Sequence, residues 1–353
     1  MTSLDPWASQ DQPDRIDAIL TEARPVSNPK TRRMRFMLGA AALGGFAILA
    51  ACGDDSTMKT AGSPASTTLG SSASSTSAPV TRTLKISAIP DQDPQKLAAR
   101  EGAMATYLNA KLGVKVEYVP VSDYAASVTL FKTGDLDLVF YGGLTGVQAR
   151  LQTPGSTLIA QRDIDDAFRT VFIANAAAGI APISDVKSLT VFKGKRFTFG
   201  SESSTSGRMM PEYFLDQAGV LSEKDFAGLP GYSGSHDKTI DLVQSGTFDG
   251  GALNVSVWNS RKKAGTVDTT KVVEIYTTPS YRDYHWIAGP KTDERFGAGF
   301  TEKVRAAILG LDYTDADQAK VLDGYAAKKF IETKADYYKE IESIGRKLKL
   351  ING

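Results

Sequence analysis

The chain has 353 residues and a formal net charge of +1, with 41 Lys and Arg against 40 Asp and Glu. This balance argues against a nucleic-acid scaffold, which would normally carry a basic face. The single cysteine, Cys52, excludes an internal disulfide and a CxxC metal site. The length and the apolar content suit a soluble α/β protein with one large domain or two medium ones.

The N-terminal segment predicts a secretory signal. Residues 31–52 read TRRMRFMLGAAALGGFAILAAC, a basic cluster followed by about 15 apolar residues, too few for a comfortable membrane span. Cys52 directly after Leu-Ala-Ala matches the bacterial lipoprotein signal, so we expect residues 1–51 to be removed and Cys52 to carry the lipid. The alternative is a cysteine in an Ala-rich core helix. Arg32-Arg33 points to twin-arginine export, but Arg35 stands where that motif prefers an apolar residue, so the route stays open.

Residues 52–81 are rich in Ser, Thr, Ala, Gly and Pro and almost free of large apolar side chains. Such a segment cannot bury enough surface to fold, so it predicts a disordered tether. Signal and tether together predict an extracytoplasmic protein, lipid-anchored to the outer face of a membrane.

The remaining chain alternates between strand-like and helix-like segments. Strands are expected at 83–90, 114–121, 136–143, 168–175, 195–200, 248–254, 271–278 and 283–289. Helices are expected at 94–113, 122–134, from 144, at 209–219, from 235, and over most of 291–348. Short connections between alternating strands and helices predict an α/β fold with a mainly parallel sheet.

The strands and helices fall into two clusters, which predicts two lobes. The chain is expected to cross between them near 168–176 and 279–288. The predicted division assigns 82–170 and 284–353 to the first lobe and 171–283 to the second.

Three predicted strand ends carry hydrogen-bond donors where a helix begins. They read YGG (141–143), SESSTSG (201–207) and GYSGSHD (231–237). Ligands of open α/β sheets bind beyond such carboxyl ends, and the first turn of a helix offers free N–H groups to an anion. We therefore interpret the hydroxyls of 201–207 as donors to an oxyanion, with simple helix capping as the alternative.

The pattern resembles a known family, the solute-binding proteins of ABC transporters for phosphate, phosphite and phosphonate, with relatives described as selenate binders. The matching pieces occur in family order: ISAIPD (86–91), VPVSDYAA (119–126), DLDLVFYGG (135–143), FGSESSTSGRMMP (199–211), GYSGSHDKTIDLVQSGTFDGGAL (231–253) and the YRDYHW region (281–286). The resemblance implies a two-lobed clamp of the type II-like periplasmic-binding-protein kind, which closes over its ligand by a hinge motion.

The resemblance also implies a set of ligand-binding residues. The Ser-Thr-Ser run grips the anion, two tyrosines and a histidine line the site, and an acidic residue lies near the second crossover. These map onto Ser204, Thr205, Ser206, Tyr124, Tyr141, His236 and Asp283. Family members that take aminoalkyl phosphonates carry a further carboxylate where this chain reads NVSVWNS (254–260), which argues against an amine-bearing ligand.

Each of these residues also has an ordinary structural interpretation. Tyr124 and Tyr141 would suit core packing, His236 would suit a helix cap, and Asp283 would pair with Arg282 or Arg208. For the same reason Arg208 is not assigned to the site, because a first-turn position often points outward.

No enzyme chemistry is predicted. GYSGS (231–235) misses the G-x-S-x-G elbow at its last position, His236 and His285 are too few for a zinc site, and no GxxxxGK[ST] run exists. No cofactor or metal is expected. The predicted partners are an oxyanion, an ABC permease with its ATPase subunit, and the membrane through the lipid anchor, with the protein itself a monomer.

The identity of the oxyanion depends on Asp283. An acceptor facing the ligand would favour a phosphorus oxyanion that carries a proton, whereas an outward Asp283 would leave a donor-only site for sulfate or selenate. We favour a phosphonate-, phosphite- or phosphate-like ligand. A ligand-sensing ectodomain on the same fold is the other functional alternative.

Overall fold

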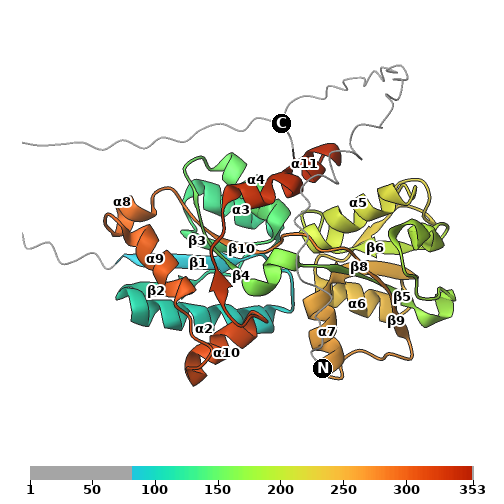
Figure 1. The fold of residues 1–353 in the computed structure, drawn as a ribbon, viewed down its shortest axis with the longest axis horizontal. Coiled ribbons are helices and arrows are strands. Elements are labelled where there is room, and N and C mark those ends of the chain that lie inside the picture. The colour runs from blue at the N-terminus through green and yellow to red at the C-terminus, as the bar shows by residue number, and fades with distance from the viewer. Residues whose placement is uncertain (1–81, 352–353) are drawn as a thin grey trace, which may run out of the picture. The chain divides into compact units, whose positions relative to one another are not determined.

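The computed structural model describes residues 82–351, which form two β-sheets covered by helices (Figure 1). The predicted signal, Cys52 and the tether lie outside the described residues, as do 352–353. Within 82–351, no helix combines the length and the apolar character that crossing a membrane requires.

The first sheet, which defines lobe 1, has the strand order β11-β4-β10-β3-β1-β2. Its strands are β1 (Thr83–Ala88), β2 (Lys115–Tyr118), β3 (Leu138–Tyr141), β4 (Thr157–Arg162), β10 (His285–Ala288) and β11 (Phe330–Ile331). Strand β1 pairs in parallel with β2 and β3, whereas β10 runs antiparallel to both β3 and β4.

The second sheet, which defines lobe 2, has the order β7-β6-β8-β5-β9. Its strands are β5 (Thr170–Asn175), β6 (Phe197–Phe199), β7 (Gly231–Tyr232), β8 (Gly250–Asn254) and β9 (Val272–Thr277). Strand β6 is parallel to β7 and β8, and β5 is antiparallel to β8 and β9.

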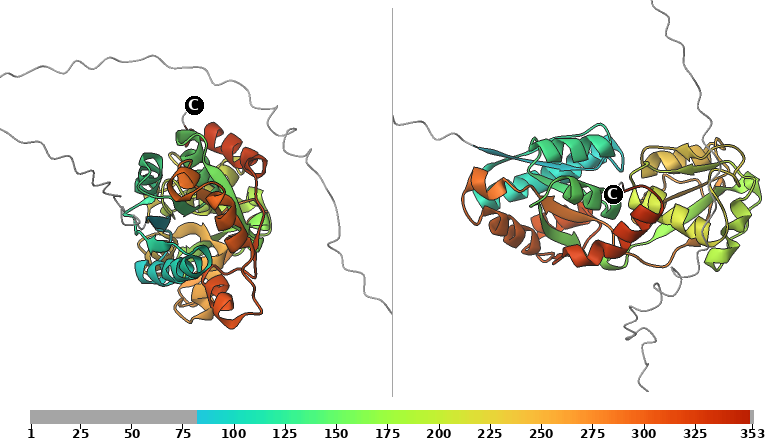
Figure 2. Two further views of the ribbon diagram at one scale, coloured as in Figure 1. Left: turned by 90° about the vertical axis from the view of Figure 1, so that its left-hand side faces the viewer. Right: turned by 90° about the horizontal axis from the view of Figure 1, so that it is seen from above.

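Helices cover both faces of each sheet, as Figures 1 and 2 show. In lobe 1, α2 (Pro94–Leu112), α9 (Phe300–Leu309) and α10 (Ala316–Gly324) pack together on one face, and α3 (Tyr124–Thr133), α4 (Gly143–Gln152) and α11 (Lys339–Lys347) on the other, with α8 (Thr292–Phe296) beside α9. Lobe 2 carries α5 (Met210–Gln217), α6 (His236–Gln244) and α7 (Val255–Lys263), together with short 3-10 segments.

The helix boundaries follow from capping side chains. Asp93 caps α2, accepting hydrogen bonds from the N–H groups of Gln95 and Lys96, and Gly113 ends that helix in the left-handed conformation. Asp123 and Gly134 bound α3 in the same way, and both helices lie within the ranges 94–113 and 122–134 that the sequence predicts.

Two crossover segments connect the lobes. The first leads from β4 through a 3-10 turn (Asp163–Ala167) to β5, and the second leads from β9 to β10. Phe168 and Tyr281 form an antiparallel bridge between the segments, with N–H···O distances of 2.8 and 2.9 Å.

The two-lobed α/β fold is confirmed, but the expectation of a mainly parallel sheet is wrong, because both sheets are mixed. The crossovers explain the difference: β5 and β10 each enter a new lobe from the crossover side and therefore run against their neighbours. The expected helical end of the chain also contains a strand, β11, which pairs with β4.

Candidate functional site

The three donor-rich strand ends meet between the lobes. A Cβ built on Gly142, after β3, would lie 3.1 Å from Thr205 Oγ1, and one on Gly207 would lie 3.1 Å from His236 Cε1. Residues from 141–143, 201–207 and 231–237 therefore contact one another, although they belong to different elements and two lobes.

The hydroxyl-rich segment is shaped by two glycines. Gly200 donates its N–H to Gly207 O at 2.7 Å, and a Cβ on either glycine would approach the other's Cα within 3.2 Å. Between them, Ser204 caps a π-helical turn, Thr205–Met209, that continues into α5. Such π-helical turns often occur at functional sites.

Hydrogen bonds to other parts of the chain hold the Ser-Thr-Ser run in place. Ser204 Oγ accepts from Gly207 N at 3.0 Å, and Thr205 Oγ1 accepts from Leu144 N at 3.0 Å. Ser206 is fixed through its carbonyl, which accepts from Thr170 Oγ1 at 2.9 Å. Its own Oγ is buried and has no hydrogen-bond partner within residues 82–351.

The N-terminus of α4 faces the same place from lobe 1. No side chain among the described residues caps this helix at Gly142; instead Gly143 N donates to Asp283 Oδ1 at 2.9 Å and Leu144 N to Thr205 Oγ1. Its first N–H groups and the positive end of its dipole thus lie beside the hydroxyl segment.

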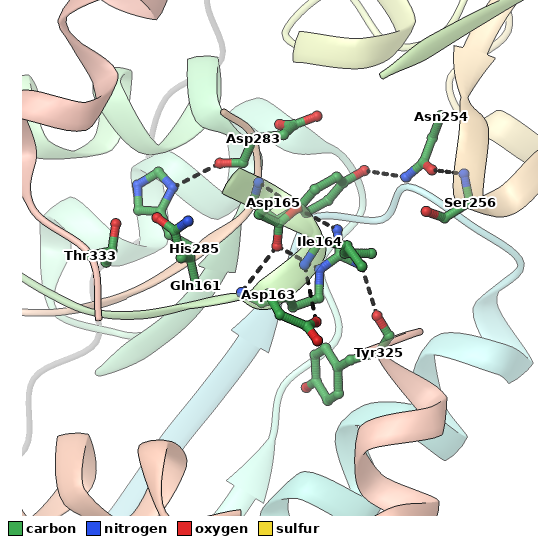
Figure 3. Close-up of polar contacts among 12 residues, drawn as sticks. Gln161, Asp163, Ile164, Asp165, Asn254, Ser256, Asp283, His285, Tyr325 and Thr333 are labelled. Carbon is green, nitrogen blue, oxygen red and sulfur yellow. Dashed lines mark hydrogen bonds and ion pairs between the residues drawn. The ribbon is translucent and has the colours of Figure 1, made fainter. Parts of the chain in front are cut away.

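Asp283, on the second crossover, points into the site. Its Oδ1 is held by Gly143, but its Oδ2 is buried and unpartnered in the described part of the chain. Burial raises the pKa of this carboxyl to about 7, with the nearby Asp165 carboxylate adding to the effect. Figure 3 shows Asp283 beside Asp165 and His285.

Tyr124, at the first position of α3, contributes another free group. Its hydroxyl is buried and has no partner among residues 82–351, and burial raises its pKa well above the usual value, so it stays a neutral donor. Tyr124 also lies at the inner wall of an open cavity of about 720 Å³ between the lobes, whose other walls come from the start of α2 and the start of α6.

His236 is fully buried, and both its ring nitrogens face protein groups. Nδ1 lies 3.4 Å from Asn254 N, and Nε2 lies 3.4 Å from Tyr284 Oη. Burial lowers its pKa, so the ring is neutral at physiological pH. The structure places Tyr141 differently: its hydroxyl donates to Ser127 O at 2.8 Å and its ring packs edge-on against Phe131.

Two residues of this region were not predicted from the sequence. Asp91, directly after the first predicted strand, accepts from Tyr284 Oη at 2.9 Å through Oδ2, and its Oδ1 is buried without a partner in 82–351. Asp91 stands at a strand's carboxyl end within the quoted ISAIPD piece, and that position was the available signal. Tyr284 had no local signal, because its role depends on contacts across the lobes.

A buried ion pair holds the backbone next to the site in place. Arg162 makes a bidentate pair with Asp165, at 2.6 and 2.7 Å, and its guanidinium lies 4.6 Å from the centre of the Tyr284 ring. Asp165 in turn accepts from the N–H groups of Asp283 and Tyr284, both at 3.2 Å. This pair therefore fixes both crossovers next to the ligand groups.

Arg208 takes no part in this arrangement. Its guanidinium pairs with Glu212 at 2.6 Å and lies over the Phe199 and Tyr232 rings. Within the described residues, no group of three or more His, Cys, Asp or Glu side chains is arranged to hold a metal ion.

Two α/β lobes, joined by two crossovers around a buried polar site, are the architecture of a ligand-binding protein. The family described as "ABC transporter, phosphonate, periplasmic substrate-binding protein" matches residues 86–338. The chain belongs to this family, which confirms the predicted resemblance and class of protein. It is a substrate-binding protein of an ABC transporter, and its family places it outside the cytoplasm.

Named relatives agree with this assignment. The chain is 51% identical over 271 residues to the "Probable ABC transporter phosphite binding protein PhnD1" of Prochlorococcus marinus (strain MIT 9301), covering 76% of this chain and 91% of the relative. The structure of that PhnD1 in complex with methylphosphonate matches with a TM-score of 0.75 and 50% identity, over 76% of this chain and 99% of the other. A phosphate-import protein, PhnD of Mycolicibacterium smegmatis, is 29% identical over 48% of this chain and 54% of the relative, so the match spans about half of that protein.

Proposed function

We propose that the site between the lobes binds a small phosphorus oxyanion, phosphite or methylphosphonate, for delivery to an ABC permease and its ATPase subunit. One observation carries the proposal. Three buried polar atoms, Tyr124 Oη, Ser206 Oγ and Asp283 Oδ2, lack hydrogen-bond partners within residues 82–351. Buried polar atoms are rarely left unsatisfied unless a ligand, ion or water completes them.

The proposed donors suit a tetrahedral anion. Ser204 and Thr205 already accept from backbone N–H groups, so each has its hydroxyl proton to donate, and Ser206 and Tyr124 add further O–H groups. Hydrogen bonds to a charged acceptor are about twice as strong as those between neutral groups. We therefore assign Ser204, Thr205, Ser206 and Tyr124 to the anion. Tyr141, whose hydroxyl faces Ser127, would contribute through packing.

Asp283 favours a ligand that carries a proton. Its pKa of about 7 means that the carboxyl and a phosphorus oxyanion would share one proton near neutral pH. A fully ionised sulfate or selenate brings no proton, and a carboxylate oxygen facing it would repel it. We therefore rank the phosphorus oxyanions above sulfate and selenate.

The ligand is proposed to be small and without an amine. The segment where amine-binding relatives carry a carboxylate forms the start of α7, and Asn254 Oδ1 is used to accept from Ser256 N at 2.7 Å, as Figure 3 shows, and from Val257 N. Asn254 Nδ2 donates to Tyr284 Oη at 3.1 Å. The groups of Asn254 are therefore engaged by the protein.

The setting of the protein in the cell is part of the proposal. Lipidation of Cys52 after removal of 1–51, with 52–81 as the tether, would hold a monomeric binding protein at the membrane beside its permease. Mass spectrometry of the mature protein tests this, because an unmodified Cys52 would exclude the anchor.

The ligand is tested by isothermal titration and thermal shift of the full chain with phosphite, methylphosphonate, phosphate, sulfate and selenate. At a hundredfold excess over Kd, a ligand stabilises the fold by about 2.7 kcal/mol, a rise in Tm of a few degrees. Binding of phosphite or methylphosphonate supports the proposal. Binding of sulfate or selenate alone would replace it with the donor-only site, and no binding at all would end the oxyanion proposal.

A further inference from the structure

Three glycines at the start of α4 (Gly142, its N-cap, and Gly143 and Gly146 within it) pack closely against the end of the second crossover and the first residue of β10. A Cβ on Gly142 would lie 3.3 Å from Asp283 Oδ1, and one on Gly143 would lie 3.3 Å from Arg282 O. At Gly146 the contact is closest, since a Cβ there would lie only 2.5 Å from Cε1 and Nε2 of His285. The imidazole of His285 thus occupies the space that any side chain at position 146 would need.

His285 packs between α4 and the C-terminal part of lobe 1. It is fully buried, and its ring centre lies 4.0 Å from that of Tyr338. Nδ1 lies 3.2 Å from the carbonyl oxygen of Asp283, which can only accept, so Nδ1 carries the proton. Figure 3 shows this contact. Nε2 has no partner among the described residues.

His285 does not change its charge in the physiological range. Burial lowers its pKa to about 3, so it serves as a neutral hydrogen-bond donor and a rigid spacer. A group of this kind can fix the position of a neighbour without introducing a charge beside an anion site.

Asp283 is consequently held at three points. Its N–H donates to Asp165 O at 3.2 Å, its carbonyl accepts from His285, and its Oδ1 accepts from Gly143 N at 2.9 Å. Only Oδ2 remains free within residues 82–351. The same α4 N-terminus gives its next N–H, from Leu144, to Thr205.

We infer that His285 and Gly146 are positioning residues, which together set the N-terminus of α4 against Asp283 and so aim the carboxylate and the hydroxyl segment at the ligand. Neither residue needs to touch the ligand. The inference deepens the proposed function and relies on it for the ligand, but the placement of Asp283 can be measured without any ligand.

Substitution of Gly146 by alanine would force a displacement. A contact of 2.5 Å must open to at least 3.4 Å, so α4 or the His285 ring moves by about 1 Å in a close-packed interior. Binding sites need their groups within about 0.5 Å of the productive geometry, so such a shift is expected to weaken phosphite binding at least about tenfold.

The first measurement follows the Gly143 amide by NMR as a function of pH in the ligand-free full chain. The charged and titratable groups that face Asp283 are Asp165 and Arg162, together with four buried tyrosines, Tyr124, Tyr281, Tyr284 and Tyr338. All of them are common to all variants. In the wild type the amide signal should titrate with a midpoint near 7, because its N–H donates to Asp283. In Gly146→Ala the midpoint should rise, since the hydrogen bond that lowers the Asp283 pKa is lengthened.

Matched variants separate positioning from stability. Gly102→Ala changes a glycine of α2 whose added Cβ would meet no described atom within 4 Å, and it should leave the titration and the phosphite Kd unchanged. His285→Asn retains a donor near Nδ1 and should keep the wild-type midpoint. His285→Leu keeps only the apolar packing and should shift the midpoint as Gly146→Ala does.

The phosphite Kd, measured from pH 5.5 to 8.5, completes the test. Phosphite itself titrates, but its protonation affects both proteins equally and cancels in the ratio of the Gly146→Ala Kd to the wild-type Kd. This ratio should change around pH 7. A wild-type midpoint in both Gly146→Ala and His285→Leu, or a flat ratio, would overturn the inference. If the wild type binds neither phosphite nor methylphosphonate, the proposed function fails, while the Gly143 titration still decides the positioning role.

Discussion

Substitution of Ser206 should separate ligand affinity from the stability of the fold more clearly than any other change at the site. Its Oγ is buried and makes no hydrogen bond within residues 82–351, while its backbone carbonyl is held by Thr170. Ser206→Ala therefore removes no intramolecular hydrogen bond of the described fold but deletes one donor to the anion. A hydrogen bond to a charged group is worth about 1.5–3 kcal/mol, so the phosphite Kd should rise about 10- to 100-fold.

The neighbouring residue provides the contrast. Ser204 Oγ caps the π-helical turn by accepting from Gly207 N, so Ser204→Ala should lower the affinity and also the free energy of unfolding, the latter by about 1 kcal/mol. For Ser206→Ala, unfolding in urea without ligand should give a free energy within about 0.5 kcal/mol of the wild type. Ser245→Ala, at an exposed hydroxyl on the end of α6, is the control for both measurements.

The comparison is made by titration calorimetry for affinity and urea unfolding for stability, at one pH. Wild-type affinity in Ser206→Ala would refute the placement of its hydroxyl against the ligand. A loss of ligand-free stability as large as the loss of binding energy would refute the argument that this hydroxyl has no structural role.

Three further predictions concern the surroundings of the site. The Asp283 pKa rises from 3.8 to about 7 on folding, so the ligand-free wild type should lose about 4 kcal/mol of stability as the pH rises from 4 to above 7. Asp283→Asn should escape this loss in urea unfolding; equal pH dependence in both proteins would contradict it. Asp165→Ala leaves Arg162 buried without its partner and should cost about 3–5 kcal/mol, largely recovered when Arg162→Met is added; failure of that recovery would argue against the pair. Gly207→Ala brings a methyl group within 3.1 Å of His236 and should cost about 1–3 kcal/mol and weaken binding, whereas a neutral result would mean that the 200–207 loop relaxes freely.

The sequence was informative about features that depend on interactions between residues close together in the chain. The hydroxyls at 204–206 could be placed at a helix start because caps, glycines and strand ends act within a few residues of one another. Helices α2 and α3 likewise begin directly after a capping side chain, Asp93 and Asp123. Tertiary contacts could not be predicted in this way: the first N–H of α4, that of Gly143, donates to Asp283, which lies 140 residues away along the chain.

The strand directions show the same limit. Alternating strands and helices predicted parallel pairing, and β1 does pair in parallel with β2 and β3. Strand β10 reaches the same sheet from the other lobe, so its direction depends on the path of the crossover rather than on its own residues. The short strand β11, Phe330–Ile331, has no periodicity to detect and is defined only by its pairing with β4.

The division of the site between the lobes explains why closure and binding should be coupled. Direct contacts between the lobes include the Leu144–Thr205 and Thr145–Ser203 hydrogen bonds at the site and the Lys96–Asp237 pair at the rim. Lys96 is half exposed, and an exposed ion pair contributes only about 0–1 kcal/mol.

Further hydrogen bonds between the lobes run from His236 N to Asp91 O at 2.9 Å and from Asp93 N to Asp237 Oδ2 at 3.0 Å. An oxyanion that accepts from the hydroxyl segment of lobe 2 and from Tyr124 of lobe 1 would interact fully only when the lobes are closed. Its differential affinity for the closed state would then set the position of the equilibrium. Three site atoms without a hydrogen-bond partner within residues 82–351, Ser206 Oγ, Tyr124 Oη and Asp283 Oδ2, are where that differential energy would arise.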